Sequence, residues 1–179
     1  MTSPSGSQAA SPLAGPASWQ LDPAGSSATF QHKTIWGLVT VRGTFRQLSG
    51  SGEIAADGSA SGRLVIEAAS LDTGHGARDR HLRSADFFDA ANHPQIVVEI
   101  SRAAARGEAA ADIAGTLTVA GITRPITLAA GITAATEQAV TLTASGEFNR
   151  ADFGMTWGRL GMIPGKAAVT VTARFTRAQ

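Results

Sequence analysis

One short segment of this 179-residue chain holds most of the side chains that could do chemistry. The majority of residues 78–89 are ionisable, and the segment ends on the apolar pair Phe87-Phe88. Within it, Asp79, His81 and Ser84 are the residue types of a Ser–His–acid relay, which needs side chains that converge beside an oxyanion site. These three do not share a helix face, and the chain has no Gly-x-Ser-x-Gly elbow. The sequence therefore argues against nucleophilic catalysis, and the segment is either a lid over an apolar interior or an active site of another kind.

The histidines of the same region are candidate metal ligands. His75, His81 and His93 lie near several aspartates, but their spacing matches no common zinc pattern. The chain has no cysteine, so a thiolate site and a disulfide framework are both excluded. We expect no metal and no cofactor, with a three-histidine site assembled from loops as the minor alternative.

A fourth histidine belongs to a different pattern. His32 shares one face of an alternating run with Ala28 and Phe30, which points its ring inward. A buried histidine needs a hydrogen-bond partner. That partner is either the polar head of a ligand or, as we favour, a neighbouring group or water.

The elements that must position these residues are strands. Eight runs alternate apolar and polar residues with a period of two, and they cover 28–32, 39–45, 64–68, 96–100, 113–119, 126–132, 142–148 and 169–175. One apolar face per strand is typical of antiparallel sheets, and the short turns between the runs favour a meander. We predict an all-β antiparallel barrel of about eight strands, with a sandwich as the alternative. A single short helix is expected over Arg78–Ala90.

The inward positions carry unusually small side chains. By parity these are Ala28, Gly43, Ala68, Gly115, Ala130, Ala144, Gly146 and Ala173. An eight-stranded barrel has room for one small ligand when its interior is not filled. The pattern predicts a cavity, unless the small residues serve only to let the sheet coil tightly.

Large rings and the inward histidine are the candidate contacts for a ligand in such a cavity. They are Phe30, His32, Trp36, Phe45, Phe87, Phe88, Phe148, Phe153 and Trp157. Core packing is the competing role for each ring. Phe87 and Phe88 follow the polar helix and suit a plug at a barrel mouth.

Composition narrows the function classes further. The net charge is +1 and the basic residues form no run, so a nucleic-acid-binding surface is not expected. Residues 1–18 are rich in Ser, Pro, Gly and Ala, and they are expected to be a disordered tail ahead of one domain at 19–179. No stretch predicts a membrane span or a secretory signal, so we expect a cytoplasmic protein.

Four blocks of this sequence resemble the YceI-like, lipocalin-like polyisoprenoid-binding family. They are ATFQHK at 28–33 with VRGTF at 41–45; SLDTG at 70–74 with RDRHLRSADFFD at 78–89 and HP at 93–94; GTLTVAGITRPI at 115–126; and FNRADFGM at 148–155. The resemblance spans about residues 19–175. It implies a lipocalin-like barrel with a short helix and an elongated apolar pore.

The resemblance also implies what the pore holds. The expected partner is a long apolar lipid: a polyisoprenoid, an isoprenoid quinone or a fatty-acyl chain. It implies no shared catalytic residues, so we expect a binding protein and no enzyme. The rival functions are an enzyme that uses His32, His81 or an aspartate in the same pocket, and a non-binding stress-response module. A homodimer would suit the Thr-rich outer faces, but nothing in the sequence requires it.

Overall fold

The computed structural model describes residues 15–34, 38–107, 109–157 and 165–178. The strands are β1 (Ala17–Leu21), β2 (Ser27–Thr34), β3 (Val39–Phe45), β4 (Leu48–Ile54), β5 (Ala60–Glu67), β6 (Leu71–Asp72), β7 (Gln95–Ala105), β8 (Ala110–Val119), β9 (Ile122–Ala135), β10 (Ala139–Asn149) and β11 (Lys166–Arg177). Within these ranges there is one α-helix, α1 (Gly76–Arg83), and there are three 3-10 turns: η1 (Pro23–Gly25), η2 (Ala68–Ser70) and η3 (Arg150–Phe153).

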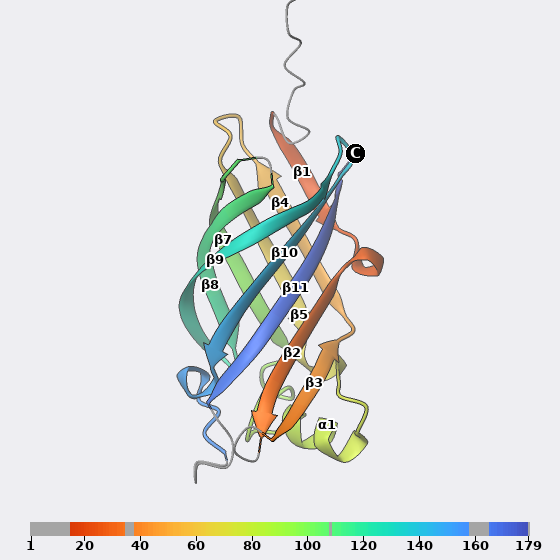
Figure 1. Ribbon diagram of the computed structural model, residues 1–179, viewed down its shortest axis with the longest axis vertical. Helices are drawn as coiled ribbons and strands as arrows, with labels where there is room; N and C mark the ends of the chain where they lie inside the picture. Colours follow the sequence, from red (N-terminus) through yellow and green to blue (C-terminus); the bar gives the residue numbers. More distant parts are fainter. Residues whose placement is uncertain (1–14, 35–37, 108, 158–164, 179) are drawn as a thin grey trace, which may run out of the picture.

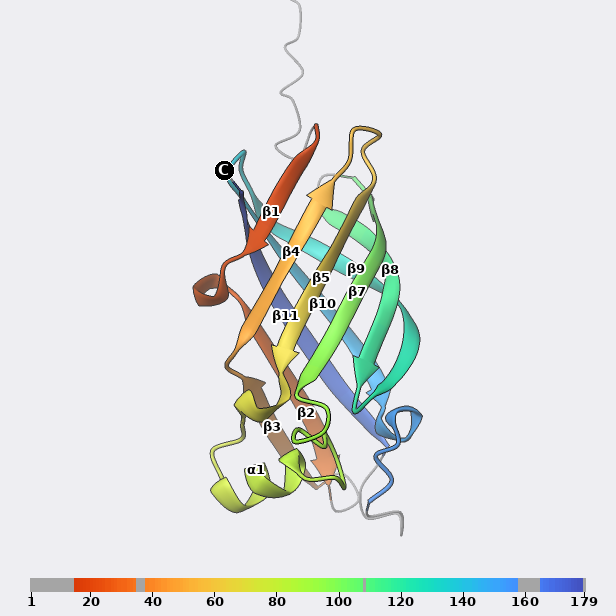
Figure 2. The same ribbon diagram turned by 180° about the vertical axis from the view of Figure 1, so that it is seen from behind.

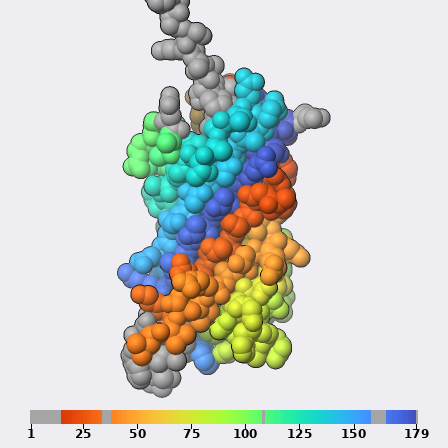
Figure 3. All heavy atoms as spheres, turned by 45° about the vertical axis from the view of Figure 1, so that its right-hand side comes forward, coloured from red at the N-terminus to blue at the C-terminus, as the bar shows by residue number. Residues whose placement is uncertain are grey.

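The strands close into an antiparallel barrel whose axis is vertical in Figure 1. Strand β11 pairs with β1 through Leu21↔Phe175 and with β2 through Ser27↔Thr172, so β1 and β2 are two halves of one kinked strand. In the same way β3 continues into β4, and β5 into β6. Counted so, eight strands surround the interior, and the predicted eight-stranded barrel with one short helix is confirmed. Figure 3 shows β10, β11, β2 and β3 as adjacent diagonal bands of one wall.

Three of the strand halves were not predicted: β1, β4 and the two-residue β6. In β4 the inward positions include Gly50 and Gly52, which leave no apolar alternation to detect. Strand β1 has only five residues and begins at Ala17, two residues before the predicted start of the domain. Strands β1 and β4 lie toward the end of the barrel away from α1, as Figure 2 shows.

The opposite end carries the one α-helix of the described chain. Strand β6 pairs with β3, while β5 pairs with β7, so residues 73–94 cross the lower end of the barrel between β6 and β7 (Figure 2). Leu82, Phe88 and Ala90 from this segment pack on the buried core.

The helix is shorter than expected and starts earlier. His75 precedes it, and the Nδ1 of His75 accepts a hydrogen bond from the Arg78 amide at 3.3 Å. At the other end Ser84 has extended backbone, and its hydroxyl donates to the His81 carbonyl at 2.7 Å. Serine competes for helix backbone groups in this way, so residues 84–90 form turns and the helix ends at Arg83. No helix of the described ranges is both long and apolar enough to cross a membrane.

Candidate functional site

The barrel encloses one long apolar cavity of about 990 Å³. Alternate residues of each strand line it, as on β11, where the lining side chains are Ala167, Val169, Val171, Ala173 and Phe175. Eight residue steps cover about 26 Å along a strand, which becomes about 20 Å along the axis of a barrel with tilted strands. The cavity is therefore a slot that suits a chain-like ligand.

The middle of the slot is bordered by a belt of small side chains. Strand register places Ala111, Ala130, Ala144, Val171 and Ala28 next to one another across β8, β9, β10, β11 and β2. All five line the cavity. Directly opposed residues of an antiparallel pair share a face of the sheet. The sequence prediction that small inward residues leave open volume therefore holds for this belt, and also for Gly146 and Ala173.

Three predicted small residues do not line the cavity and have other roles. A Cβ on Gly43 would stand 2.3 Å from the Phe30 ring, so this glycine makes room for that ring. A Cβ on Gly115 would stand 1.9 Å from the Glu99 carbonyl, beside an irregularity in the β7–β8 register, so this glycine lets the two strands approach. Ala68 is fully buried in the core near α1. At these positions, tight coiling and core packing explain the small side chain.

Five of the predicted aromatic residues line the slot near its α1 end. They are Phe30, Phe45, Phe88, Phe148 and Phe153. The rings of Phe30 and Phe45 lie 5.9 Å apart, and Phe88 meets Phe45 edge-on at 5.6 Å. With buried Met155 they close this end of the slot.

Phe87 and Trp157 contact each other and do not line the cavity, although Phe87 packs against the buried core. The Phe87 ring lies 5.7 Å from Trp157, and the His81 ring meets both edge-on at 5.1 and 4.5 Å. Trp157 is 46% exposed. The Phe87-Phe88 pair is thus split, because neighbouring side chains point different ways: Phe88 faces the slot and Phe87 joins the helix to the turn after β10. Trp36 lies outside the described residues.

His32 also does not line the cavity. Its Nδ1 is 3.1 Å from the Lys166 carbonyl, which accepts, so Nδ1 carries the proton. Burial lowers the pKa of His32, the Lys166 contact opposes this, and the charge of Arg150 lowers it further. The ring is therefore neutral at neutral pH. Its Nε2 is buried without a hydrogen-bond partner among the described residues.

The slot reaches the surface at the end away from α1, which we call the mouth. Exposed turn residues Gly58 and Gly107 line the cavity there, as does exposed Ala135. Trp19 lines the same end and is 5% exposed, with the Arg177 guanidinium 5.9 Å from its ring centre. Phe87 and Phe88 lie at the opposite end of the barrel, where Phe88 lines the slot and helps to close it, as expected of a plug, whereas Phe87 does not line the slot. The helix follows β6 in the chain, and β6 lies at the end away from the mouth.

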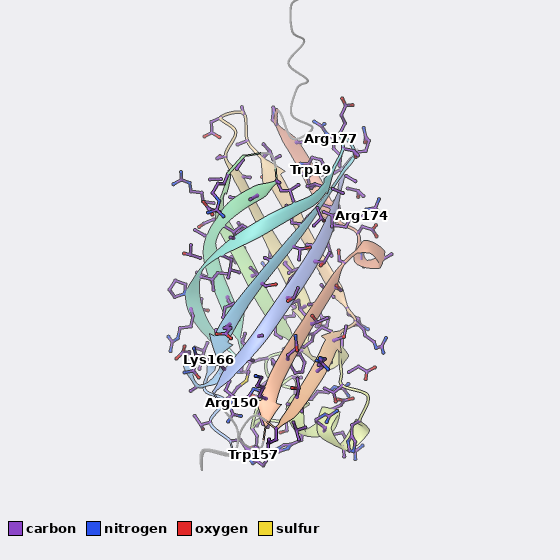
Figure 4. The ribbon with its side chains drawn as sticks, viewed as in Figure 1. Trp19, Arg150, Trp157, Lys166, Arg174 and Arg177 are labelled. Atoms are coloured by element: carbon purple, nitrogen blue, oxygen red, sulfur yellow. The ribbon has the colours of Figure 1, made fainter. Side chains whose placement is uncertain are left out.

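One cation lines the inner part of the slot. Arg150 opens η3, and its position near the α1 end is shown in Figure 4. Its Nη2 donates to the Trp157 carbonyl at 2.8 Å, and its guanidinium lies 5.9 Å from the centre of the Phe87 ring. Burial lowers the pKa of Arg150. Sequence patterns did not single out this residue, because arginine is common on surfaces.

The charged segment around α1 is used for structure. Asp79 is buried, and its Oδ1 accepts hydrogen bonds from the Thr73 amide at 3.0 Å and the Thr73 hydroxyl at 2.5 Å. Arg78 donates to Thr73 as well, and Arg83 donates to the Leu71 carbonyl. The side chains of this segment hold the chain between β6 and α1 in place.

The relay residues considered from the sequence do not converge. Asp79 is held by Thr73, the Ser84 hydroxyl donates to the His81 carbonyl, and the His81 Nε2 lies 3.1 Å from Asp86. Across the part of the chain that the structure describes, no group of three or more His, Asp or Glu side chains could hold a metal ion. The slot can hold an apolar chain, and the polar side chains of the α1 segment serve local structure.

Comparison with known proteins gives a family match across the barrel. A model described as a YceI-like domain matches residues 19–176. A UPF0312 protein of Ectopseudomonas mendocina is 34% identical over 117 residues, which are 64% of this chain and 61% of that protein. One from Azotobacter vinelandii is 40% identical over 90 residues, or 49% and 47% of the two chains. The matches thus span about half to two thirds of these relatives.

Solved structures share the fold. Burkholderia cenocepacia BcnA superposes with a TM-score of 0.77 at 21% identity, over 86% of this chain and 98% of its own. A polyisoprenoid-binding domain from Saccharophagus degradans, implicated in plant cell wall breakdown, gives a TM-score of 0.74 at 20% identity, over 90% and 99%. At this identity the likeness concerns the architecture.

Proposed function

This chain belongs to the YceI-like family, and from its closed barrel and apolar slot we propose that it binds one long lipid chain inside the barrel. The candidate lipids are a polyisoprenoid, an isoprenoid quinone or a fatty-acyl chain, bound for carriage, storage or sequestration. The observation that carries the proposal is the slot of about 990 Å³ with its belt of small side chains. A polyisoprenoid-binding domain of the same architecture supports it.

The energetics suit such a ligand. Each buried methylene contributes about 0.8 kcal/mol, so a long chain gains affinity along its whole length without specific polar contacts. Selectivity would then come from the length of the slot and from a few polar groups at its ends. We propose binding and not turnover, because the charged residues that line the slot are spread between its two ends: Glu53 and Arg63 near the mouth and Arg150 near α1.

The test begins with gentle purification of the protein. Native mass spectrometry of the intact complex and organic extraction of the same sample then show whether a lipid is bound and identify it. In parallel, the delipidated protein is titrated with diphenylhexatriene, an apolar fluorescent probe, and with isoprenoids. Recovery of a lipid, or saturable binding with a rise in Tm, supports the proposal. No recovered lipid, no probe binding and no shift in Tm would together overturn it.

A matched pair of variants locates the site. Ala144→Phe places a ring in the belt and should weaken probe binding at least tenfold. Ser145→Phe adds the same ring one residue along, where the side chain is exposed on the outer face. It should leave binding unchanged, and equal loss in both variants would mean that the probe binds outside the barrel.

A further inference from the structure

The charged residues that line the slot differ in their surroundings. Glu53 and Arg63 are near the mouth, where Glu53 is exposed and the Arg63 side chain is 51% exposed and lies 3.3 Å from Glu99. Arg150 lies at the other end, among Phe148, Phe153 and Met155. A cation in apolar surroundings interacts much more strongly with a ligand oxygen than one in water.

We propose that Arg150 binds the hydrogen-bond-accepting head of the lipid, so that the head lies near α1 and the tail points to the mouth. The inference rests on the proposed function and adds the chemistry of the head and its orientation. The shared chemistry is a carbonyl or carboxylate oxygen at one end of a long apolar chain. A fatty acid and an isoprenoid quinone both provide it.

The position of Arg150 is fixed before any ligand arrives. Its amide donates to the Gly165 carbonyl at 2.8 Å, and its carbonyl accepts from the Met155 amide at 3.1 Å. The guanidinium is held by the Trp157 carbonyl and by the face of Phe87. A side chain already ordered in this way loses little conformational entropy on binding a ligand.

The chemistry of the group suits an oxygen acceptor. A guanidinium has five N–H donors in a plane and can hold more than one acceptor. Nearby His32 is neutral, since burial lowers its pKa, so among the residues that line the slot at this end Arg150 supplies the positive charge. Hydrogen bonds from a charged donor are stronger than those between neutral groups.

The mouth offers the competing anchor. Trp19 Nε1 is buried, has no hydrogen-bond partner among the described residues, and belongs to a side chain that lines the slot. The indole N–H is a neutral donor, whereas Arg150 brings a full charge. The two sites lie at opposite ends of the barrel in Figure 4, so they predict opposite orientations of the ligand.

The binding test compares three probes on delipidated protein: palmitate, decylubiquinone and diphenylhexatriene, which has no acceptor. Arg150→Gln should weaken palmitate, decylubiquinone or both by about ten- to a hundredfold, and should leave diphenylhexatriene unchanged. If the variant weakens the binding of palmitate alone, the head is a carboxylate. If it weakens the binding of decylubiquinone alone, the head is a quinone. Arg150→Lys keeps the charge and should give an intermediate loss for palmitate. Arg174→Gln, an exposed outer-face control on β11, should change nothing.

Orientation is measured separately in the unmodified binding site. Bromine quenches the fluorescence of a nearby tryptophan. The emission of Trp19 is obtained by subtracting the spectrum of Trp19→Phe from that of the unmodified protein. With the tail at the mouth, 16-bromohexadecanoate, which carries bromine at the end of its tail, should quench this emission. Equal loss of all three probes in Arg150→Gln would make Arg150 a structural residue and overturn the proposal. Loss of the oxygen-bearing probes in Trp19→Phe instead, or quenching of Trp157 and not of Trp19, would overturn it too. Failure of diphenylhexatriene to bind the unmodified protein, together with no recovered lipid and no shift in Tm, would overturn the proposed function itself.

Discussion

The mouth and the α1 end of this barrel are built from different kinds of side chain. At the mouth the slot is bordered by exposed glycine and alanine in short turns, such as Gly58, Gly107 and Ala135. At the α1 end it is closed by phenylalanine rings and by a helix that buried Asp79 and several arginines hold in place. The difference teaches that one end is made to stay closed, while the other leaves a path to solvent.

Removing the clamp at the α1 end should have the largest effect on stability. Asp79→Ala leaves the Thr73 amide and hydroxyl without their acceptor, and it should cost about 2–4 kcal/mol of unfolding free energy. Urea denaturation measures this. The control at the mouth is Asp57→Ala, whose carboxylate accepts from the Ser59 amide and hydroxyl in an exposed turn. Its effect should be small, and equal losses would contradict the difference between the ends.

The split between Phe87 and Phe88 gives the next effect. Phe88→Ala removes a half-buried ring from the closed end of the slot and should cost about 2 kcal/mol, below the usual loss for a fully buried ring. It should also lengthen the slot and improve the binding of longer chains. Phe87→Ala breaks ring contacts outside the slot and should cost about 1 kcal/mol without changing the preferred chain length. Titrations with a series of fatty acids distinguish the two, and an identical change in both variants would refute the split.

Two glycines offer a finer comparison. Gly43→Ala puts a Cβ 2.3 Å from Phe30 and must push that ring, at a cost of about 1 kcal/mol and with weaker binding of diphenylhexatriene. Gly52→Ala near the mouth meets its first neighbour at 3.5 Å, an ordinary contact. It should be close to neutral in thermal unfolding and in probe binding. A neutral Gly43→Ala would mean that the α1 end is less tightly packed than the contacts indicate.

The smallest expected effect is a pH dependence from His32. Because burial lowers its pKa in the folded state, the unfolded chain binds a proton first as the pH falls below about 6.5. The neutral ring therefore favours folding fully above that pH, and this contribution is lost as the pH falls toward the folded pKa. Tm measured from pH 7.5 to 5 should fall more steeply in the unmodified protein than in His32→Gln. Parallel curves would show that His32 does not contribute.

Much of the wall was predictable from the sequence, because alternation of apolar and polar residues reports which face of a strand is buried. Strand β4 was missed because glycine replaces inward side chains there, and β1 because it has only five residues. Of the candidate ligand contacts, Phe30, Phe45, Phe88, Phe148 and Phe153 line the slot, whereas His32, Phe87 and Trp157 do not. The alternation along a strand correctly places Phe30 and Phe148 on the inward face. It cannot predict which rings face inward in a turn, such as Phe87 and Phe88.

The sequence alone determined that this chain is built of antiparallel strands with small inward side chains and one charged helical interruption, since these follow from local periodicity and composition. Periodicity favoured a barrel over a sandwich, and the closed strand pairing decided between them. Only the tertiary structure decided which end is open, that Phe88 and not Phe87 meets the slot, and that Arg150 lies beside it. These depend on how far-apart strands come into register around a closed barrel. The size of the cavity depends on how side chains from distant strands face one another once the barrel has closed, and no local sequence pattern encodes their relative positions.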